Sequence, residues 1–343
     1  RRSSGRSHDF GRYVKASLYL QIQISTTQMA NYLVTGGAGF IGSHIVDALL
    51  NRGDSVRVLD NLNSGIGQER LTDRDRLEFI QGDLLDSEVI SRAVEGIDVV
   101  FHQAALASVP YSLENPLATH SVCATGTLQL LESSRAAGVR RLVYAGSSSC
   151  YGQSTSEIQR EGDVTKPCSP YGAAKLAGEQ YCHAFYESYG FETVVLRYFN
   201  VFGPRQDPNS QYAAVIPIFI TRMLNGQAPI VFGDGTQSRD FTFVANVVHG
   251  NLLAAEASAA VGHSINMAAG MRVSLNTLID SLNELMGTEV AADYQPERAG
   301  DIKHSSADIS LARELLGYEP VVSLQDGIRE TLEYYKSVHS VKN

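Results

Sequence analysis

From Met29 onward, short runs of β-branched and other apolar residues alternate with longer amphipathic stretches. Buried parallel strands produce such runs, and the helices that connect them produce the amphipathic stretches. The pattern predicts strands over residues 32–35, 55–59, 77–80, 99–102, 142–145 and 193–198, and helices over residues 41–51, 87–94, 117–137 and 171–189. Because crossovers between parallel strands are right-handed, we expect an α/β fold built on a doubly wound parallel sheet.

Beyond about residue 200 the pattern changes to loops rich in Pro, Gly and Asp, with helical segments over residues 274–286 and 324–335. We therefore expect a doubly wound domain over residues 29–200. Residues 201–343 should form mainly a smaller α/β cap, with some chain returning to the first domain.

The first 28 residues are rich in Arg and Ser and differ from everything that follows. Gln21 and Gln23 interrupt their apolar segment, which argues against a signal peptide. We expect residues 1–28 to be a disordered or non-native leader, with the natural start at Met29. A transit peptide is the alternative.

The overall composition narrows the class of protein. A chain of 343 residues with 43% hydrophobic and 19% charged residues is typical of a globular protein, and its net charge of -9 argues against nucleic-acid binding. The sequence contains no apolar run of about 18 residues, so we expect no membrane span. The cysteines, which show neither a C-x-x-C pair nor zinc-ligand spacing, are Cys123, Cys150, Cys168 and Cys182. We expect reduced thiols, no metal site and a cytoplasmic location.

A glycine-rich turn joins the first strand to the first helix. Residues 32–42 read YLVTGGAGFIG and contain G-x-G-x-x-G as Gly37, Gly39 and Gly42. Such glycines let the backbone approach a pyrophosphate, whose charge then lies at the helix N-terminus. Asp60, about 20 residues on, ends the second strand, where a carboxylate binds ribose hydroxyls and repels a 2'-phosphate. The segment predicts a Rossmann-type site that prefers NAD to NADP; a glycine turn in an ordinary βαβ unit is the alternative.

Asp83 follows the third strand in the sequence Gln-Gly-Asp-Leu. It is placed to reach the adenine end of a dinucleotide. A helix cap is an equally good interpretation.

A tyrosine and a lysine lie four residues apart at the start of the helix predicted over residues 171–189. Ser169 is the expected N-cap and Pro170 the first helical residue. Tyr171 and Lys175 then share one helical face. A lysine ammonium, together with a nearby positive nicotinamide ring, would lower the pKa of the phenol from about 10 and make it a base. The pair predicts proton abstraction from a sugar hydroxyl, although Y-x-x-x-K also occurs by chance.

Ser147, Ser148 and Ser149 follow the strand predicted over residues 142–145. Open α/β sheets bind their ligands at the C-terminal ends of strands. Ser147 could therefore hydrogen-bond the hydroxyl that Tyr171 deprotonates. A serine-rich turn is the alternative for one of the three.

Together these residues resemble the extended short-chain dehydrogenase/reductase family, specifically its UDP-sugar 4-epimerases, from Met29 to about residue 335. The likeness is greatest to the bacterial UDP-N-acetylglucosamine 4-epimerases. It is most specific over residues 196–209, 212–217, 233–240 and 298–308. The resemblance implies that Tyr171 and Ser147 assist oxidation of the 4-hydroxyl, that the 4-keto sugar turns over, and that hydride returns to its opposite face.

The resemblance also implies a set of site residues. The catalytic residues would be Ser147, Tyr171 and Lys175. The NAD-binding residues would be Gly36, Gly39, Phe40, Ile41, Gly42, Asp60, Asn61, Asp83, Leu84, Gln103, Ala104, Ala105, Ser108, Tyr171, Lys175 and Tyr198. The substrate-binding residues would be Ser148, Ser149, Asn200, Gln206, Ala214, Val215, Arg239, Arg298, Asp301 and Ser305.

Within that set, Asn200, Arg239 and Arg298 would contact the diphosphate, and Asp301 the uridine ribose. A surface ion pair is the alternative for Arg298. Ser305 stands where epimerases limited to glucose and galactose carry a bulky Tyr, so the small side chain implies room for a 2-acetamido group. Two departures are Cys123, where many relatives have Asn, and Ala107, where the most similar ones have Gly beside the sugar.

Three other functions are compatible with parts of this pattern. A 4,6-dehydratase would need an Asp-Glu pair where residues 147–151 read SSSCY, so dehydration is not expected. A UDP-glucuronate epimerase or decarboxylase remains open, as does a catalytically silent NAD-binding regulator. The family pairs the helices predicted over residues 117–137 and 171–189 in a four-helix homodimer interface. Burial within one chain would also explain their apolar faces.

Overall fold

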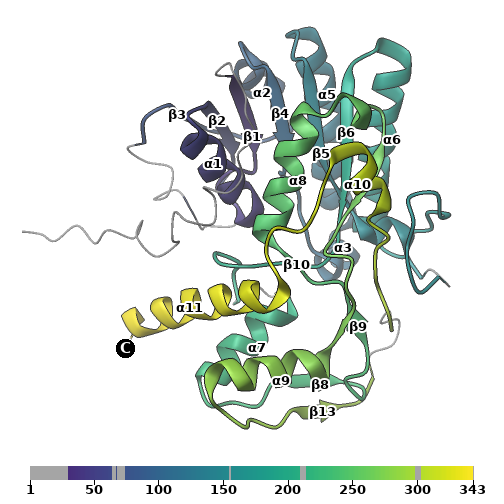
Figure 1. Cartoon of the computed structure of the whole chain (residues 1–343). Helices are drawn as coiled ribbons and strands as arrows, with labels where there is room; N and C mark the ends of the chain where they lie inside the picture. The colour runs from purple at the N-terminus through teal and green to yellow at the C-terminus, as the bar shows by residue number, and fades with distance from the viewer. Residues whose placement is uncertain are drawn as a thin grey trace, which may run out of the picture.

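The computed structural model describes residues 30–63, 67, 74–153, 156–208, 214–297 and 303–342 (Figure 1). The expected leader, residues 1–28, lies outside the described residues.

A parallel sheet forms the centre of the upper part of Figure 1. Over the described residues its seven strands run in the order β11-β6-β5-β4-β1-β2-β3, the doubly wound order with one added strand. Their bounds are β1 Asn31–Thr35, β2 Ser55–Asp60, β3 Leu77–Gln81, β4 Val99–His102, β5 Arg141–Ser147, β6 Glu192–Tyr198 and β11 Ser264–Met267. The predicted fold class and the six predicted strands are confirmed.

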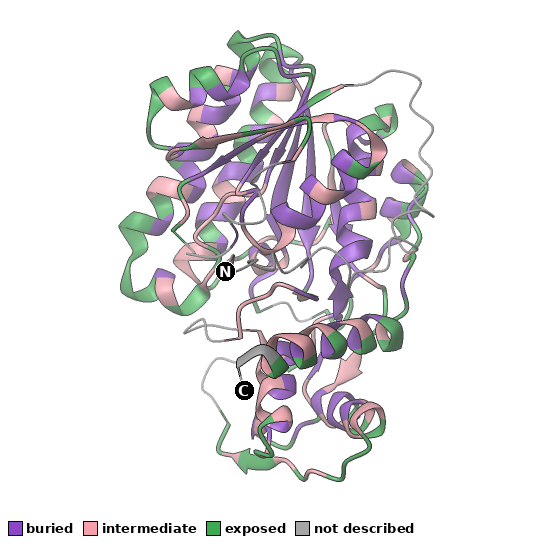
Figure 2. Cartoon of the chain, turned by 90° about the vertical axis from the view of Figure 1, so that its left-hand side faces the viewer, coloured by how far each residue is buried: buried purple, intermediate pink, exposed green. Residues whose placement is uncertain are grey.

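Helices cover both faces of this sheet. Tyr32 and Val34 of β1 pack with α1 (Phe40–Arg52) and α8 (Val244–Glu256), whereas Leu33 packs with residues of α2 (Ser87–Val94), α5 (Thr127–Ala136) and α6 (Pro170–Tyr189). Successive strand residues thus face opposite helical layers, and both kinds are buried. This explains why the strands read as continuous apolar runs (Figure 2).

The sequence pattern did not predict α8 and β11, which follow residue 200 and complete the sheet. Helix α8 lies against α1, and β11 pairs with β6. Most residues of α8 are buried, including Asn246 and Asn251. A helix buried on nearly all sides lacks the single apolar stripe that marks an amphipathic helix.

The helix expected over residues 117–137 is present with a different internal geometry. Its parts are α4 (Pro116–His120), a π-helical segment (Ser121–Gly126) and α5. A short helix, α3 (Val109–Glu114), precedes it. Helix α6 begins as predicted, since the Ser169 hydroxyl accepts a hydrogen bond from the Gly172 amide at 3.1 Å.

The lower part of Figure 1 is a smaller α/β unit. Its helices are α7 (Val215–Leu224), α9 (Leu275–Met286) and α11 (Leu324–Lys342). Helices α9 and α11 confirm the two predicted helical segments, and α11 is longer than predicted. Three short strand pairs complete it: β8 (Ile230–Phe232) with β13 (Asp293–Gln295), β9 (Ser238–Arg239) with β12 (Val273–Ser274), and β7 (Val201–Phe202) with β10 (Thr242–Phe243). Phe219, Phe243, Leu278 and Ile328 lie in its core.

Helix α10 (Ser310–Leu316) packs back against β11 and α8. Among the helices of the described residues, none combines the length and the hydropathy that crossing a membrane would require.

Candidate active site

The glycine turn between β1 and α1 is closely packed. Gly36 has a φ of +68°, and a Cβ there would lie 2.7 Å from the Ala104 amide nitrogen; a Cβ on Gly42 would lie 2.1 Å from the Gly36 carbonyl oxygen. Only glycine fits both positions. Gly39 is the N-cap of α1, and within the described chain no side chain caps this helix end. Its first amides and positive helix end therefore suit a pyrophosphate, flanked by the expected Phe40 and Ile41.

Asp60 ends β2 beside this turn. Its Oδ2 accepts a hydrogen bond from the Ala38 amide at 3.0 Å, and its Oδ1 accepts one from the Leu62 amide at 2.8 Å. The carboxylate thus holds the turn and places a negative charge where a 2'-phosphate would have to bind. The donor set fits NAD.

Asp83 lies next to Asn61, another expected NAD contact. Asn61 Nδ2 donates to Asp83 Oδ2 at 2.8 Å. The alternative interpretation of Asp83 as a helix cap is wrong, because Asp86 caps α2 and accepts a hydrogen bond from the Glu88 amide at 3.0 Å. Leu84 is buried directly after Asp83.

Three polar side chains, each from a different part of the chain, form a hydrogen-bonded cluster beyond the end of β4. The Tyr198 hydroxyl is 3.1 Å from Gln103 Oε1 and accepts a hydrogen bond from Asn251 Nδ2 at 2.8 Å. Gln103 and Tyr198 were expected at the cofactor, whereas Asn251 on α8 was missed. The available signal was an asparagine within an otherwise apolar stretch. Ser108, expected near the nicotinamide, caps α3 by accepting from the Tyr111 amide at 3.1 Å.

His102 at the end of β4 joins the segment that contains Ala104 and Ala105 to the π-helical segment. The Thr127 hydroxyl donates to the Cys123 carbonyl at 2.8 Å, so it accepts at 3.0 Å from Nε2–H of His102. Burial and then the Lys175 charge lower the pKa of His102 to about 3. The ring is neutral, and its Nδ1 accepts from the Thr35 hydroxyl at 2.7 Å. These bonds define one tautomer.

The predicted catalytic hydroxyls lie together at the C-terminal edge of the sheet. Ser147 ends β5, and Tyr171 occupies the first turn of α6. Burial raises the pKa of Tyr171 to about 12, and a hydrogen bond with the Ser147 hydroxyl opposes this. The sequence predicted that Lys175 and a positive nicotinamide ring together lower this pKa, whereas in the protein alone burial raises it. A positive charge beside the phenol would lower that pKa.

Lys175 lies one helical turn beyond Tyr171 and is buried. Burial lowers the pKa of its ammonium. Its Nζ lies 4.3 Å from the centroid of the Tyr144 ring, whose negative face favours a cation. The lysine is therefore held in place by an aromatic residue that the sequence motif does not contain. Ser148 and Ser149, expected to bind substrate, begin the 3₁₀ helix that follows Ser147.

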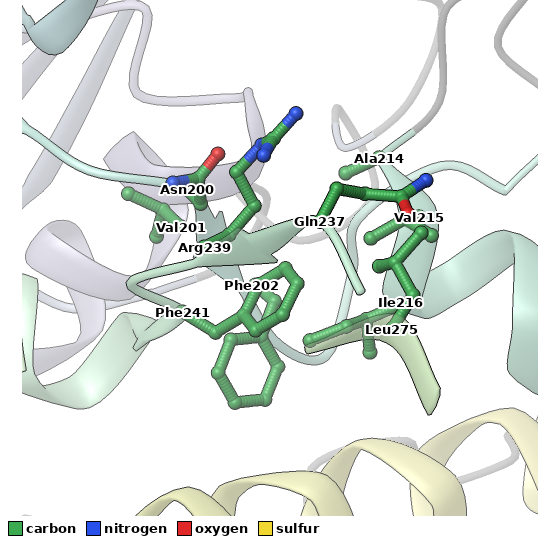
Figure 3. Close-up of a pocket in the computed structure, with 10 residues that line it drawn as sticks. All are labelled: Asn200, Val201, Phe202, Ala214, Val215, Ile216, Gln237, Arg239, Phe241 and Leu275. Carbon is green, nitrogen blue, oxygen red and sulfur yellow. The ribbon is translucent and has the colours of Figure 1, made fainter. Parts of the chain in front are cut away.

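A pocket lies between β7, β9 and the N-terminus of α7 (Figure 3). Its lining includes four residues expected to bind substrate, namely Asn200, Ala214, Val215 and Arg239, together with Val201, Phe202, Ile216, Gln237, Phe241 and Leu275, which the sequence did not indicate. Asn200 has a φ of +32°, which asparagine tolerates better than most residues, and its Nδ2 donates to the Asp240 carbonyl at 3.2 Å. Arg239 contributes a cation to this pocket.

Ser305 lies beside the strand that contains Arg239, because its amide donates to the Ser238 carbonyl at 3.1 Å. Gln206 is held by a hydrogen bond from its Nε2 to the Val201 carbonyl at 3.2 Å. Ser305 is thus a neighbour of the strand β9, and its place at the sugar stays a prediction. Arg298 and Asp301, expected at the diphosphate and ribose, lie outside the described residues.

Known proteins resemble this chain in sequence and in fold. Residues 32–268 match the model of the "NAD dependent epimerase/dehydratase family". The UDP-glucose 4-epimerase of Mycolicibacterium smegmatis is 37% identical over 309 residues, covering 89% of this chain and 98% of that protein.

Two solved structures are similar over nearly their whole length. The UDP-N-acetylglucosamine 4-epimerase from Methanobrevibacter ruminantium M1, in complex with UDP-N-acetylmuramic acid, is 40% identical with a TM-score of 0.86, covering 91% of this chain and 99% of that one. The UDP-glucuronic acid 4-epimerase from Bacillus cereus, in complex with UDP-glucuronic acid and NAD, is 34% identical with a TM-score of 0.82, covering 90% and 99%.

Proposed function

This chain belongs to the NAD dependent epimerase/dehydratase family, and we propose that it inverts the configuration at carbon 4 of a UDP-hexose, with UDP-GlcNAc and UDP-GalNAc as its substrates and UDP-Glc and UDP-Gal accepted alongside them. The family expected from the motifs is confirmed, and NAD is its cofactor. The observation that carries the proposal is the placement of Tyr171, in the first turn of α6 and one turn before buried Lys175, beside Ser147 at the C-terminal edge of the sheet.

These side chains divide the proton chemistry. NAD, when bound, accepts the hydride of carbon 4 and later returns it to the opposite face of the sugar. Tyr171 takes the proton of the 4-hydroxyl, and Ser147 holds the same oxygen by a hydrogen bond. Lys175 stabilises the phenolate. In the return step Tyr171 would give the proton back to the 4-oxygen while the hydride returns to carbon 4, and because the hydride is returned the reaction has no net redox change.

The exchange of faces requires the nucleotide to stay bound while the 4-keto sugar turns over. Asn200 and Arg239 in the pocket of Figure 3 would hold the diphosphate, where the planar guanidinium can bind two phosphate oxygens. The expected contacts of Arg298 and Asp301 would add to this hold. Binding energy concentrated on the nucleotide leaves the sugar free to turn.

The substrate preference follows from Ser305. Its amide is hydrogen-bonded to the carbonyl of Ser238, the neighbour of Arg239, so this residue lies close to the pocket that Arg239 lines. A hydroxymethyl group there leaves space that a phenol ring would fill. A 2-acetamido group on the sugar needs that space, and Ala107 narrows it by only one methyl group relative to glycine.

A second candidate is 4-epimerisation of UDP-glucuronate, or its decarboxylation. The similarity to the Bacillus cereus UDP-glucuronic acid 4-epimerase favours it. The test is to incubate purified protein with NAD and, separately, UDP-GlcNAc, UDP-Glc and UDP-GlcA, and to resolve the products by NMR.

We expect UDP-GalNAc from UDP-GlcNAc at the highest kcat/KM. Epimerisation or carbon dioxide release from UDP-GlcA alone would replace the proposal with the second candidate. If no nucleotide sugar is converted, the chain is a catalytically silent NAD-binding protein.

We also propose a homodimer. Leu113, Leu117 and Tyr181 lie on the adjoining helices α3, α4 and α6 and are 63%, 82% and 38% exposed. Large apolar side chains that gather on one exposed helical face favour a protein partner. A second copy of this chain would bury them in a four-helix contact.

A further inference from the structure

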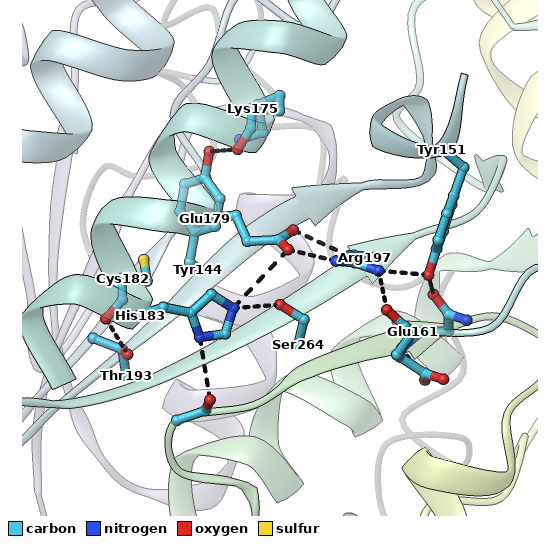
Figure 4. A network of polar contacts seen from close by, with 12 residues as sticks. Tyr144, Tyr151, Glu161, Lys175, Glu179, Cys182, His183, Thr193, Arg197 and Ser264 are labelled. Atoms are coloured by element: carbon cyan, nitrogen blue, oxygen red, sulfur yellow. Dashed lines mark hydrogen bonds and ion pairs between the residues drawn. The ribbon is translucent and has the colours of Figure 1, made fainter. Parts of the chain in front are cut away.

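A buried ion pair connects α6, the helix that contains Tyr171 and Lys175, to strand β6 (Figure 4). Glu179 follows Tyr171 and Lys175 at the same four-residue spacing on α6, and Arg197 lies on β6. Arg197 Nε donates to Glu179 Oε2 at 3.1 Å, and its Nη2 donates to Oε1 at 2.5 Å. Both side chains are almost fully buried. A forked pair of this kind fixes the helix on the strand in a single geometry.

Arg197 also binds Tyr151, which ends the 3₁₀ helix that begins after Ser147. Its Nη1 donates to the Tyr151 hydroxyl at 2.7 Å, and the guanidinium carbon lies 4.9 Å from the centroid of the Tyr151 ring. The Tyr151 hydroxyl then donates to Asn266 Oδ1 at 2.6 Å. Tyr151 is 2% exposed, and Arg197 and Asn266 are the hydrogen-bond partners of its hydroxyl.

The chain of bonds continues from Asn266 to the segment that contains Ser305. Asn266 Nδ2 donates to the Gln159 carbonyl at 3.1 Å. Gln159 forms two hydrogen bonds with the backbone of Ser306. Its side-chain Oε1 accepts from the Ser306 amide at 3.0 Å, and its backbone amide donates to the Ser306 carbonyl at 2.8 Å. Ser306 is the neighbour of Ser305.

From these contacts we infer that Tyr151 is a positioning residue that holds the catalytic helix and the sugar-facing segment in register. On one side it is bonded to Arg197, which fixes α6 through Glu179. On the other side it is bonded to Asn266, which fixes residues 305–306 through Gln159. The inference rests on the proposed function, because the role it gives Tyr151 is to keep the Tyr171 phenol at the right distance from the sugar.

The experiment compares Tyr151→Phe with Tyr32→Phe. Tyr32, near the start of β1, lies in similar surroundings. It is 1% exposed, and its hydroxyl accepts a hydrogen bond from Arg52 Nη2 at 2.6 Å and donates one to Glu256 Oε1 at 3.3 Å. The guanidinium carbon of Arg52 lies 5.3 Å from the centroid of the Tyr32 ring. Each variant loses one buried hydroxyl with an arginine partner. A purely structural role therefore predicts the same effect for both.

We expect Tyr151→Phe to lower kcat for UDP-sugar epimerisation about tenfold, because small displacements of reacting groups cost one or two orders of magnitude in rate. The KM for the UDP-sugar should stay within about twofold, since Asn200 and Arg239 hold the nucleotide independently. The ratio of kcat for UDP-GlcNAc to kcat for UDP-Glc should also change. Tyr32→Phe should show a similar loss of Tm with kcat and the ratio unaltered.

Equal losses of kcat in the two variants, or a Tyr151→Phe enzyme with unchanged kcat and substrate ratio, would overturn the inference alone. Arg197→Lys gives a second reading, because it keeps the charge but cannot reach both Glu179 and Tyr151, and it should reproduce the altered ratio. Absence of turnover by the unchanged protein would overturn the proposed function and this inference with it.

Discussion

The ammonium of Lys175 lies over the face of the Tyr144 ring, with Nζ 4.3 Å from the ring centroid, and the Tyr144 hydroxyl donates to the Lys175 carbonyl at 3.1 Å (Figure 4). Tyr144 thus contacts both ends of the same residue. A desolvated cation–π contact is worth about 2 kcal/mol. The ring therefore decides where the lysine charge lies relative to Tyr171.

We expect Tyr144→Leu to lower kcat roughly tenfold, because Lys175 loses a cation–π contact of about 2 kcal/mol that holds its ammonium in place. Tyr144→Phe is the matched control, since it keeps the ring and removes only the hydroxyl. Steady-state kinetics with a UDP-sugar measures both. Equal kcat values for the Leu and Phe variants would show that the ring face does not orient Lys175.

Tyr171→Phe removes the proposed base. Turnover should fall by roughly 10²–10⁴-fold, the range that a positioned acid–base group supplies. Binding of NAD, measured by calorimetry, should change little, because the glycine turn and Asp60 remain. Ser147→Ala should cost less, since it removes one hydrogen bond and leaves the proton acceptor. A Phe variant with unaltered turnover would contradict the assignment of Tyr171.

Ser305→Tyr should change the substrate preference. A phenol ring in place of a hydroxymethyl group occupies the space proposed for the 2-acetamido group. We expect kcat/KM for UDP-GlcNAc to fall by about 10–200-fold, as for other pocket-size changes, and kcat/KM for UDP-Glc to change much less. Ser305→Thr is the control of intermediate size. If the ratio of the two substrates stays the same in Ser305→Tyr, this residue does not select the sugar.

His102 should make the protein less stable in acid. Burial and then the Lys175 charge lower its pKa from 6.5 to about 3, so between these values the unfolded chain binds a proton that the folded protein does not. Stability is therefore lost as the pH falls from 6.5 toward 3, with a slope contribution of about 1.4 kcal/mol per pH unit.

Urea unfolding of His102→Gln between pH 4 and 7 should show a shallower dependence on pH than the unchanged protein. The variant is also expected to be less stable at pH 7, because Thr35 and Thr127 lose a partner. His263→Gln, at an exposed site, is the control and should keep the original slope. A His102→Gln variant with the full slope would show that another group causes the acid sensitivity.

Leu117→Glu should disrupt the proposed homodimer. Leu117 is 82% exposed on α4, beside the exposed apolar residues of α3 and α6. A carboxylate there would be buried without a partner in a two-fold contact. Light scattering should return twice the chain mass for the unchanged protein and one chain mass for the variant. Val164→Glu, at an equally exposed apolar position in a loop, should remain dimeric; a monomeric unchanged protein would refute the proposal.

The local features of this protein follow from its sequence. Three features each depend on residues that are neighbours in the chain: the strand before and the helix after the glycine turn, the helix start at Pro170, and the four-residue spacing of Tyr171 and Lys175. Backbone periodicity converts such spacing directly into position on a strand or a helical face. The pattern also predicted that ligands bind at the C-terminal end of the strand before Ser147, and Ser147 does end β5.

Tertiary structure alone decided the features that depend on distant packing. Asn251 reaches Tyr198 because a buried helix lies across the sheet, and Tyr151 reaches Asn266 across 115 positions of sequence. The pKa of Tyr171 is raised rather than lowered because burial outweighs its neighbours. Desolvation and long-range contacts are set by whatever covers a residue in the folded chain, and no local spacing in the sequence encodes that.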